Sequence, residues 1–174
     1  MQRRRWLIIL LCVVALFAAL LIYANLKDAP LPDGFQADKI LVEKSRHQLT
    51  LLKNGAAIKT YKIALANPTG NKVQEGDNRT PEGIYTIDRR NDKSGFHLAL
   101  HVSYPNQFDI VRAQQAGVAP GGDIMIHGLR NGLGWIGKLH RLSDWTRGCM
   151  AVTNPEIEEI ARAVPNGTAI EILP

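Results

Sequence analysis

The segment from residue 123 to residue 152 contains a thiol and an imidazole that could form a catalytic pair. His127 ends the short apolar run 124–127, and Cys149 closes the turn-like sequence Thr146-Arg147-Gly148-Cys149. A cysteine becomes a nucleophile when a nearby imidazole takes its proton, and the fold can bring together two side chains that are distant in sequence. We therefore predict Cys149 as the nucleophile and His127 as its general base.

The residues before Cys149 are candidates for the rest of such a site. Gly148 allows a sharp turn, so the backbone N–H groups of Gly148 and Cys149 could face the oxyanion of a tetrahedral intermediate. Thr146 could hydrogen-bond the cleft wall or the substrate, and Arg147 could favour the thiolate or bind a substrate carboxylate. We predict Thr146 and Arg147 as substrate-binding residues.

A fixed base needs a partner for its second ring nitrogen. For His127 that partner is expected to be a backbone carbonyl, for which Gly128 is the first candidate, with Asp123 and Asp144 as alternatives. His140 is the rival base, but its neighbours suggest an exposed loop, whereas a strand end holds His127 in place.

Two further histidines raise the possibility of a metal site. His97 and His101 lie four residues apart in a predicted strand, where that spacing separates them by about 13 Å. The sequence offers no third ligand nearby, so we predict no metal.

Three glycines of the loop before Cys149 match a nucleotide-binding pattern: Gly132, Gly134 and Gly137. They lack the strand and helix that surround such a pattern in nucleotide-binding proteins. No cofactor is therefore predicted.

The N-terminus reads as a membrane segment. Residues 6–26 contain no charged residue, and as a helix they are long enough to cross a hydrocarbon core of about 30 Å. Arg3, Arg4 and Arg5 precede them, which places the N-terminus in the cytoplasm and the rest of the chain on the periplasmic side. We expect residues 1–26 to be an uncleaved anchor rather than a signal segment, because the apolar run is long and the sequence Ile22-Tyr23-Ala24 is a poor cleavage site.

Composition constrains the part of the chain beyond the anchor. Three of the 21 basic residues are Arg3, Arg4 and Arg5, and the remaining 18, from Lys27 onward, nearly balance 16 acidic ones, which argues against nucleic-acid binding. Prolines and a glycine mark residues 27–37 as a linker, and residues 38–174 suffice for one domain, expected to be a monomer. Cys12 lies within the anchor, so Cys149 is the lone thiol outside it.

Hydrophobic periodicity predicts a mainly β domain with one or two small helices. A meander is expected at the start, where Asn54-Gly55 indicates a hairpin turn, and Asn154 is expected to cap the last helix. The predicted strands are 40–44, 48–52, 57–66, 84–87, 96–102, 124–127 and 168–173, and the predicted helices are 108–116 and 155–164.

The motifs resemble the YkuD-type L,D-transpeptidases of bacterial cell-wall metabolism. The matches are His127-Gly128, the sequence Thr146-Arg147-Gly148-Cys149, and the strand entry Thr80-Pro81-Glu82-Gly83, and the resemblance covers residues 40–173. It implies a sandwich-like fold of mixed or antiparallel sheets. This sequence departs from the family at Ala151, where many members have Arg, and in its long loop 129–145.

The resemblance also implies a function. Cys149 would attack the carbonyl of the third residue of a peptidoglycan stem peptide, and an amine would resolve the thioester. Three alternatives stay open: hydrolysis of the same bonds by a carboxypeptidase or amidase, a cysteine protease with another substrate, and a membrane-anchored wall-binding protein with an inert cysteine. The expected partners are stem peptides and, through residues 6–26, the cytoplasmic membrane.

Overall fold

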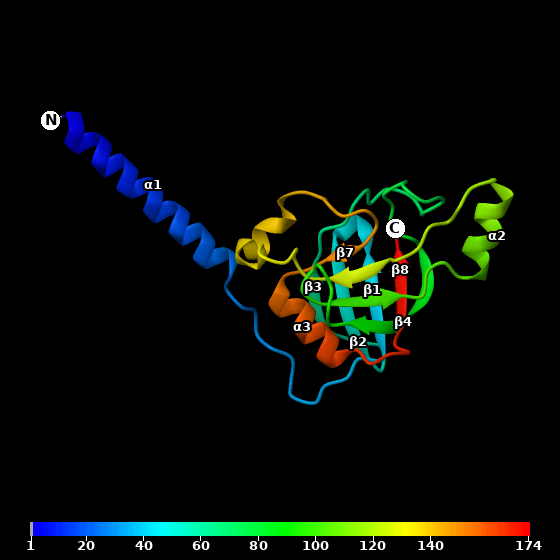
Figure 1. Ribbon diagram of the computed structural model, residues 1–174. Coiled ribbons are helices and arrows are strands. Elements are labelled where there is room, and N and C mark those ends of the chain that lie inside the picture. The colour runs from blue at the N-terminus through cyan, green and yellow to red at the C-terminus, as the bar shows by residue number, and fades with distance from the viewer. Residues whose placement is uncertain (1) are drawn as a thin grey trace.

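The first helix stands apart from the rest of the molecule. The computed structural model describes residues 2–174, and α1 (Gln2–Ala24) projects from a β-rich domain (Figure 1). Only Ala24, at its last position, is buried. The core helix of a soluble domain would be covered along its apolar side, so α1 has the length and exposure of a membrane span or a signal segment.

Eight strands form one mixed sheet that curls on itself, which confirms the predicted mainly β fold. The strand order is β3-β2-β1-β8-β4-β5-β6-β7. Two neighbouring pairs, β1 with β8 and β6 with β7, are parallel, and the others are antiparallel. The strands are β1 (Lys39–Glu43), β2 (Gln48–Lys53), β3 (Ala56–Lys62), β4 (Gly83–Asn91), β5 (Ala99–Val102), β6 (Met125–His127), β7 (Met150–Ala151) and β8 (Ala169–Leu173).

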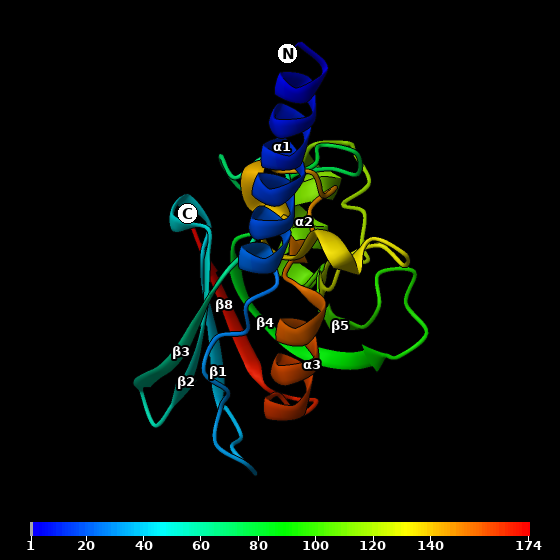
Figure 2. The same ribbon diagram turned by 90° about the vertical axis from the view of Figure 1, so that its left-hand side faces the viewer.

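Alternating side chains and one amphipathic helix build the core. In β1 the side chains of Ile40 and Val42 are buried while their neighbours are partly exposed, as a half-buried strand requires. Helix α3 (Asn154–Ala163) packs Ile157 and Ile160 into the same cluster and lies against the sheet (Figure 2). The remaining helices are α2 (Gln107–Gln115) and the short 3₁₀ segments η1 (Lys44–Arg46) and η2 (Gly134–Leu142).

Three details of the predicted elements are wrong. The strand expected over 96–102 begins only at Ala99, because His97 adopts a left-handed φ of 68° that breaks the extended backbone. The strand expected over 57–66 ends at Lys62. Helix α3 is capped by Thr153, whose hydroxyl and backbone form a capping box with Glu156, so Asn154 is free for another role.

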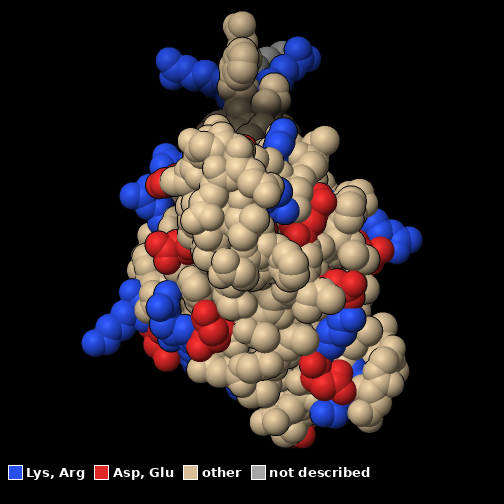
Figure 3. Space-filling model, turned by 90° about the vertical axis from the view of Figure 1, so that its right-hand side faces the viewer, with Lys and Arg blue, Asp and Glu red and all other residues tan. Residues whose placement is uncertain are grey.

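The surface away from α1 mixes charges of both signs. On the side of the domain seen in Figure 3, basic and acidic side chains are interspersed among neutral ones. Such mixing leaves no large single-sign field on this side. The picture agrees with the near balance of charge in the sequence beyond the N-terminal arginines.

A buried carboxylate fastens the segment 25–37 to the domain. Glu159, on α3, is 8% exposed and accepts hydrogen bonds from the Lys59 ammonium (2.6 Å), the Tyr61 hydroxyl (2.7 Å) and the Leu31 backbone N–H (2.6 Å). Burial opposes ionisation, but these three donors outweigh it and lower the pKa of Glu159. The predicted linker therefore runs along the domain and is held there by a hydrogen bond from Leu31 to the ionised Glu159 of α3.

Glu159→Ala is expected to lower the free energy of unfolding by about 3 kcal/mol, because it leaves the buried Tyr61 hydroxyl without its acceptor and removes the ion-pair partner of the partly buried Lys59 ammonium, which among residues 2–174 keeps only the Ala29 carbonyl. Glu158→Ala is the matched control on the same helix. Its carboxylate is 48% exposed and pairs with His97 near solvent, so its loss should cost less than about 1 kcal/mol. Urea unfolding of the full chain in detergent measures both, and equal losses would contradict the assignment.

Candidate active site

His127 and Cys149 line one cleft, as the sequence predicts. The cleft has a volume of about 980 Å³ and is also bordered by Phe96, Trp145 and Arg147. His127 comes from the end of β6, and Cys149 immediately precedes β7. Cys149 is partly exposed, so its sulfur lies at the cleft surface and is not enclosed in the core.

The strand register explains how the two residues come together. In the parallel pair β6–β7, Ile126 faces Met150 and His127 faces Ala151. Extending that register by one residue sets Cys149 beside Met125, two positions from His127 and on the same face. With strands about 4.8 Å apart and a rise of about 3.3 Å per residue, the Cα atoms of Cys149 and His127 are about 8 Å apart, a spacing that two inclined side chains can bridge.

The hydrogen bonding of His127 fixes which ring nitrogen can act as a base. Its Nδ1 lies 2.7 Å from the carbonyl oxygen of Gly128. A carbonyl only accepts, so Nδ1 carries the proton and Nε2 keeps a free lone pair. Burial lowers the pKa of His127, with the Gly128 bond acting in the opposite direction, and the ring therefore stays neutral at neutral pH. This is the state that a general base needs.

Aromatic rings and a backbone carbonyl, not an aspartate, hold this imidazole. Its ring centroid lies 4.6 Å from that of Phe96 and 5.8 Å from that of Trp145. The alternative orienting residues serve elsewhere: Asp144 accepts from the Leu65 N–H and bonds to His47, and Asp123 has a mostly exposed side chain. Of the three orienting groups that the sequence suggests, only Gly128 contacts the His127 ring.

Cys149 rests as a thiol. Burial raises its pKa, and a hydrogen bond from the Met125 backbone opposes that effect only in part. The S–H group is 3.5 Å from the carbonyl oxygen of Asp123, and among residues 2–174 no hydrogen bond joins the sulfur to the imidazole. A neutral thiol beside a neutral imidazole is a resting pair in which the proton moves as the nucleophile attacks, and such contacts commonly tighten when substrate binds.

The turn before Cys149 depends on Thr146 and Gly148. The Thr146 hydroxyl donates to the Cys149 carbonyl (2.7 Å) and accepts the Gly148 N–H (3.4 Å), so this side chain is used within the turn and is not free for substrate. Gly148 has φ of +116°, and a Cβ there would lie 2.8 Å from the Arg79 carbonyl oxygen. The N–H of Gly148 points to Thr146 in this state, whereas exposed Arg147 is available at the cleft mouth.

His140 is buried, contrary to the exposed position that its neighbours suggest. It sits in η2 at 5% exposure, packs edge-on against Trp145 at 6.3 Å, and has no hydrogen-bond partner within residues 2–174 on either ring nitrogen. Burial, with smaller contributions from Arg141 and His127, lowers its pKa to about 4. His140 therefore forms part of the cleft wall, without the hydrogen bond that would orient a base.

His140→Phe is expected to make the protein less sensitive to acid. The folded pKa of His140 is about 4 against an ordinary 6.5, so the folded state favours the neutral ring. Its contribution is complete above pH 6.5 and is lost as the pH falls towards 4, a change of about 3 kcal/mol at most. The apolar replacement should remove that slope and cost little at pH 7, because no hydrogen bond is broken. Unfolding measured from pH 7 to pH 4 tests this, and an unchanged slope would contradict it.

The two histidines considered for a metal lie in separate contacts. His97 bonds to Glu158 at 2.7 Å and His101 bonds to Asp88 at 2.6 Å. Within residues 2–174, no group of three His, Cys, Asp or Glu side chains is arranged to hold an ion.

The sequence does not reveal the role of Asn154, which stabilises the backbone beside the cleft. The Asn154 side-chain oxygen accepts the Leu129 N–H at 2.8 Å, immediately after the His127-Gly128 motif. The sequence suggests that Asn154 caps the last helix, and this interpretation concealed its contact with Leu129. The one signal for the contact is that Asn154 is a polar residue shortly after Cys149.

Ala151 is fully buried and exchanges two backbone hydrogen bonds with Ala64. The position at which the sequence departs from the family pattern therefore faces the interior.

Comparison with known proteins decides the family. The family model for the YkuD L,D-transpeptidase catalytic domain matches residues 37–172. The chain belongs to this family. YafK of Escherichia coli K12, itself assigned as an L,D-transpeptidase only provisionally, is 30% identical over 108 residues, which are 60% of this chain and 36% of YafK. This YkuD-family chain thus spans about a third of the length of that curated relative.

Solved structures share the YkuD fold. The helical cell shape determining protein Pgp2 of Campylobacter jejuni superposes with a TM-score of 0.60 at 24% identity, over 89% of this chain and 54% of Pgp2. Bd1075 of Bdellovibrio bacteriovorus gives 0.54 at 25% identity, over 86% and 52%. An L,D-transpeptidase of Xylanimonas cellulosilytica gives 0.51 at 14% identity, over 83% and 64%. These similarities show the fold, and the match to the family model places the chain in the L,D-transpeptidase catalytic domain family.

Proposed function

We propose that this protein is a cysteine acyltransferase acting on peptidoglycan stem peptides, an L,D-transpeptidase. The observation that carries the proposal is the placement of Cys149 and His127 on one face of the β6–β7 pair, in the same cleft, with the imidazole held by Gly128 in the tautomer of a base. Family membership supports the proposed substrate class.

The reaction can be written from these groups. As the Cys149 sulfur attacks the carbonyl carbon of the third stem residue, its proton passes to Nε2 of His127 and a C–S bond forms. The tetrahedral intermediate collapses with cleavage of the C–N bond, and His127 returns the proton to the departing D-amino acid. An acceptor amine then attacks the thioester and gives its proton to His127, the C–S bond breaks, and His127 passes the proton to the departing Cys149 sulfur, so a peptide bond replaces the one that was broken.

The other proposed roles are subsidiary. Gly128 orients His127, Arg147 binds a substrate carboxylate at the cleft mouth, and the backbone N–H of Cys149 faces the oxyanion, joined by that of Gly148 once it leaves Thr146. Thr146 acts through the turn that it holds. The protein is proposed to sit in the cell envelope, with α1 across the cytoplasmic membrane and the catalytic domain on the periplasmic side.

The test is direct. The full chain in detergent is incubated with wall fragments bearing tetrapeptide stems, and the products are weighed by mass spectrometry. Loss of the terminal D-amino acid with a new crosslink supports transfer, loss without a crosslink indicates hydrolysis, and unchanged fragments argue against the enzyme. A carbapenem, whose strained β-lactam carbonyl acylates reactive thiols, should leave a covalent adduct on Cys149, and folded protein without an adduct would favour an inert cysteine.

A further inference from the structure

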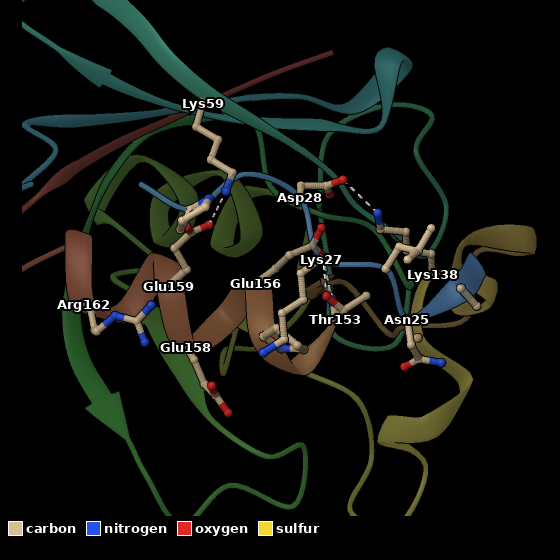
Figure 4. A pocket seen from close by; sticks show the side chains of 15 residues that line it. Asn25, Lys27, Asp28, Lys59, Lys138, Thr153, Glu156, Glu158, Glu159 and Arg162 are labelled. Carbon is tan, nitrogen blue, oxygen red and sulfur yellow. Dashed lines mark hydrogen bonds and ion pairs between the residues drawn. The ribbon is translucent and has the colours of Figure 1, made fainter. Parts of the chain in front are cut away.

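The end of α1 is docked on η2. The carbonyl of Ala24, which is 1% exposed, approaches Gly137 so closely that a Cβ there would lie 2.3 Å from it. The Asn25 side chain donates to the Trp135 carbonyl at 2.8 Å. Asp28 then pairs with Lys138 at 2.9 Å, and Figure 4 shows this pair across the pocket between the segment after α1 and η2. The end of α1 and the residues that follow it therefore contact η2 directly, with no flexible linker between them.

The length of α1 determines where the contact between α1 and η2 lies relative to the bilayer. Residues 6–24 form about 28 Å of helix at about 1.5 Å per residue, and a hydrocarbon core is about 30 Å thick. With the N-terminal arginines at one surface, Ala24 reaches the opposite boundary of the core. Any segment that touches Ala24 and Asn25 must then lie among the lipid headgroups, because no aqueous gap separates it from the end of the span.

The side chains of η2 fit that position. Trp135 is 56% exposed and Leu142 is 84% exposed, although both are large and apolar. Lys138 and Arg141 lie between them in the same segment, but they are already paired with Asp28 and Glu156. Exposed tryptophan is typical of the membrane interface, where the ring lies at the headgroup level. The other side of η2 faces the catalytic cleft through Ile136, Leu139 and His140.

We propose that η2 is a membrane-surface element, with Trp135 inserted at the headgroup level of the bilayer that holds α1. The inference rests on the proposed membrane-spanning role of α1. In this arrangement the proposed catalytic cleft lies beside the bilayer, because η2 contacts lipid on one side and lines the cleft on the other. The stem peptides within reach are then those held close to the membrane.

Fluorescence quenching in vesicles tests this with the full chain. The chain contains three tryptophans, Trp6, Trp135 and Trp145. One variant keeps only Trp135, through Trp6→Phe and Trp145→Phe. A second keeps only Trp6, which lies in α1 and reports insertion. The third replaces all three by Phe and carries Phe108→Trp, at an 83% exposed position on α2, far from α1 (Figure 1). Each is reconstituted in phosphatidylethanolamine and phosphatidylglycerol vesicles, with or without lipids brominated near the headgroup.

The expected result is strong quenching of Trp135 by the brominated lipids together with quenching of Trp6, and none in the Phe108→Trp variant. Quenched Trp6 with unquenched Trp135 overturns the proposal. If Trp6 also escapes quenching, the membrane-spanning premise fails as well. Should Trp145→Phe impair folding, the difference in quenched emission between the wild-type chain and Trp135→Phe gives the same answer. None of these readouts depends on turnover, so failure of the proposed chemistry is detected separately.

Discussion

Cys149→Ser is expected to reduce turnover of stem peptides by about 10⁴-fold or more. A serine hydroxyl ionises far less readily than a thiol. In this cleft the base that would activate it has a pKa lowered by burial, which weakens it further. Serine is also close to cysteine in size, so the Thr146–Cys149 turn should be kept and the free energy of unfolding should change little. Mass spectrometry of wall-fragment products gives the rate, and the carbapenem adduct gives an independent measure.

Cys12→Ser is the matched control for that substitution. Cys12 is the other free cysteine among residues 2–174, and it lies exposed in the apolar helix α1, away from the cleft. Its replacement should leave both the rate and the adduct unchanged. Turnover that survives Cys149→Ser would show that the thiol is not the nucleophile, whereas loss of the adduct in Cys12→Ser would show that the carbapenem reports the wrong sulfur.

Local patterns in the sequence predict the reactive pair and most of the strands. His127 ends the short apolar run 124–127, which is typical of a buried strand, and Gly148 precedes Cys149 at a turn, so the immediate neighbours of each residue indicate its setting. The Asn54-Gly55 hairpin likewise indicates that β2 and β3 are adjacent and antiparallel, as found. These features depend on contacts between residues close in sequence.

Features that depend on distant contacts could not be predicted. The parallel pairing of β1 with β8 joins the two ends of the domain, and no periodicity encodes it. The sequence predicts a loop over residues 129–145, yet part of it forms η2, which Asn25 and Asp28 contact at Trp135 and Lys138 from more than a hundred positions away. The roles of Thr146 and Asn154 follow from the direction of their side chains, which composition does not specify.

His127→Gln is expected to lower turnover by about 10²- to 10⁴-fold, the usual contribution of a general base. Glutamine can keep a hydrogen bond to the Gly128 carbonyl but cannot take the proton of Cys149. In the wild-type protein the rate should fall as the pH drops through the lowered pKa of His127, because protonated imidazole has no lone pair for the thiol proton, and it should be level around neutral pH. The measurement is a pH–rate profile with stem-peptide fragments at saturating and subsaturating concentrations.

The shape of the profile separates a lost base from a damaged fold. Without His127, the residual rate depends on thiolate that forms spontaneously, and burial raises the pKa of Cys149. The rate of His127→Gln should therefore climb steadily with pH through the neutral range, where the wild type is level. His140→Phe serves as the control: it changes the cleft wall but leaves the base, so it should keep the level region and the acid limb. If His140→Phe abolished the acid limb and His127→Gln retained it, His140 would be the base.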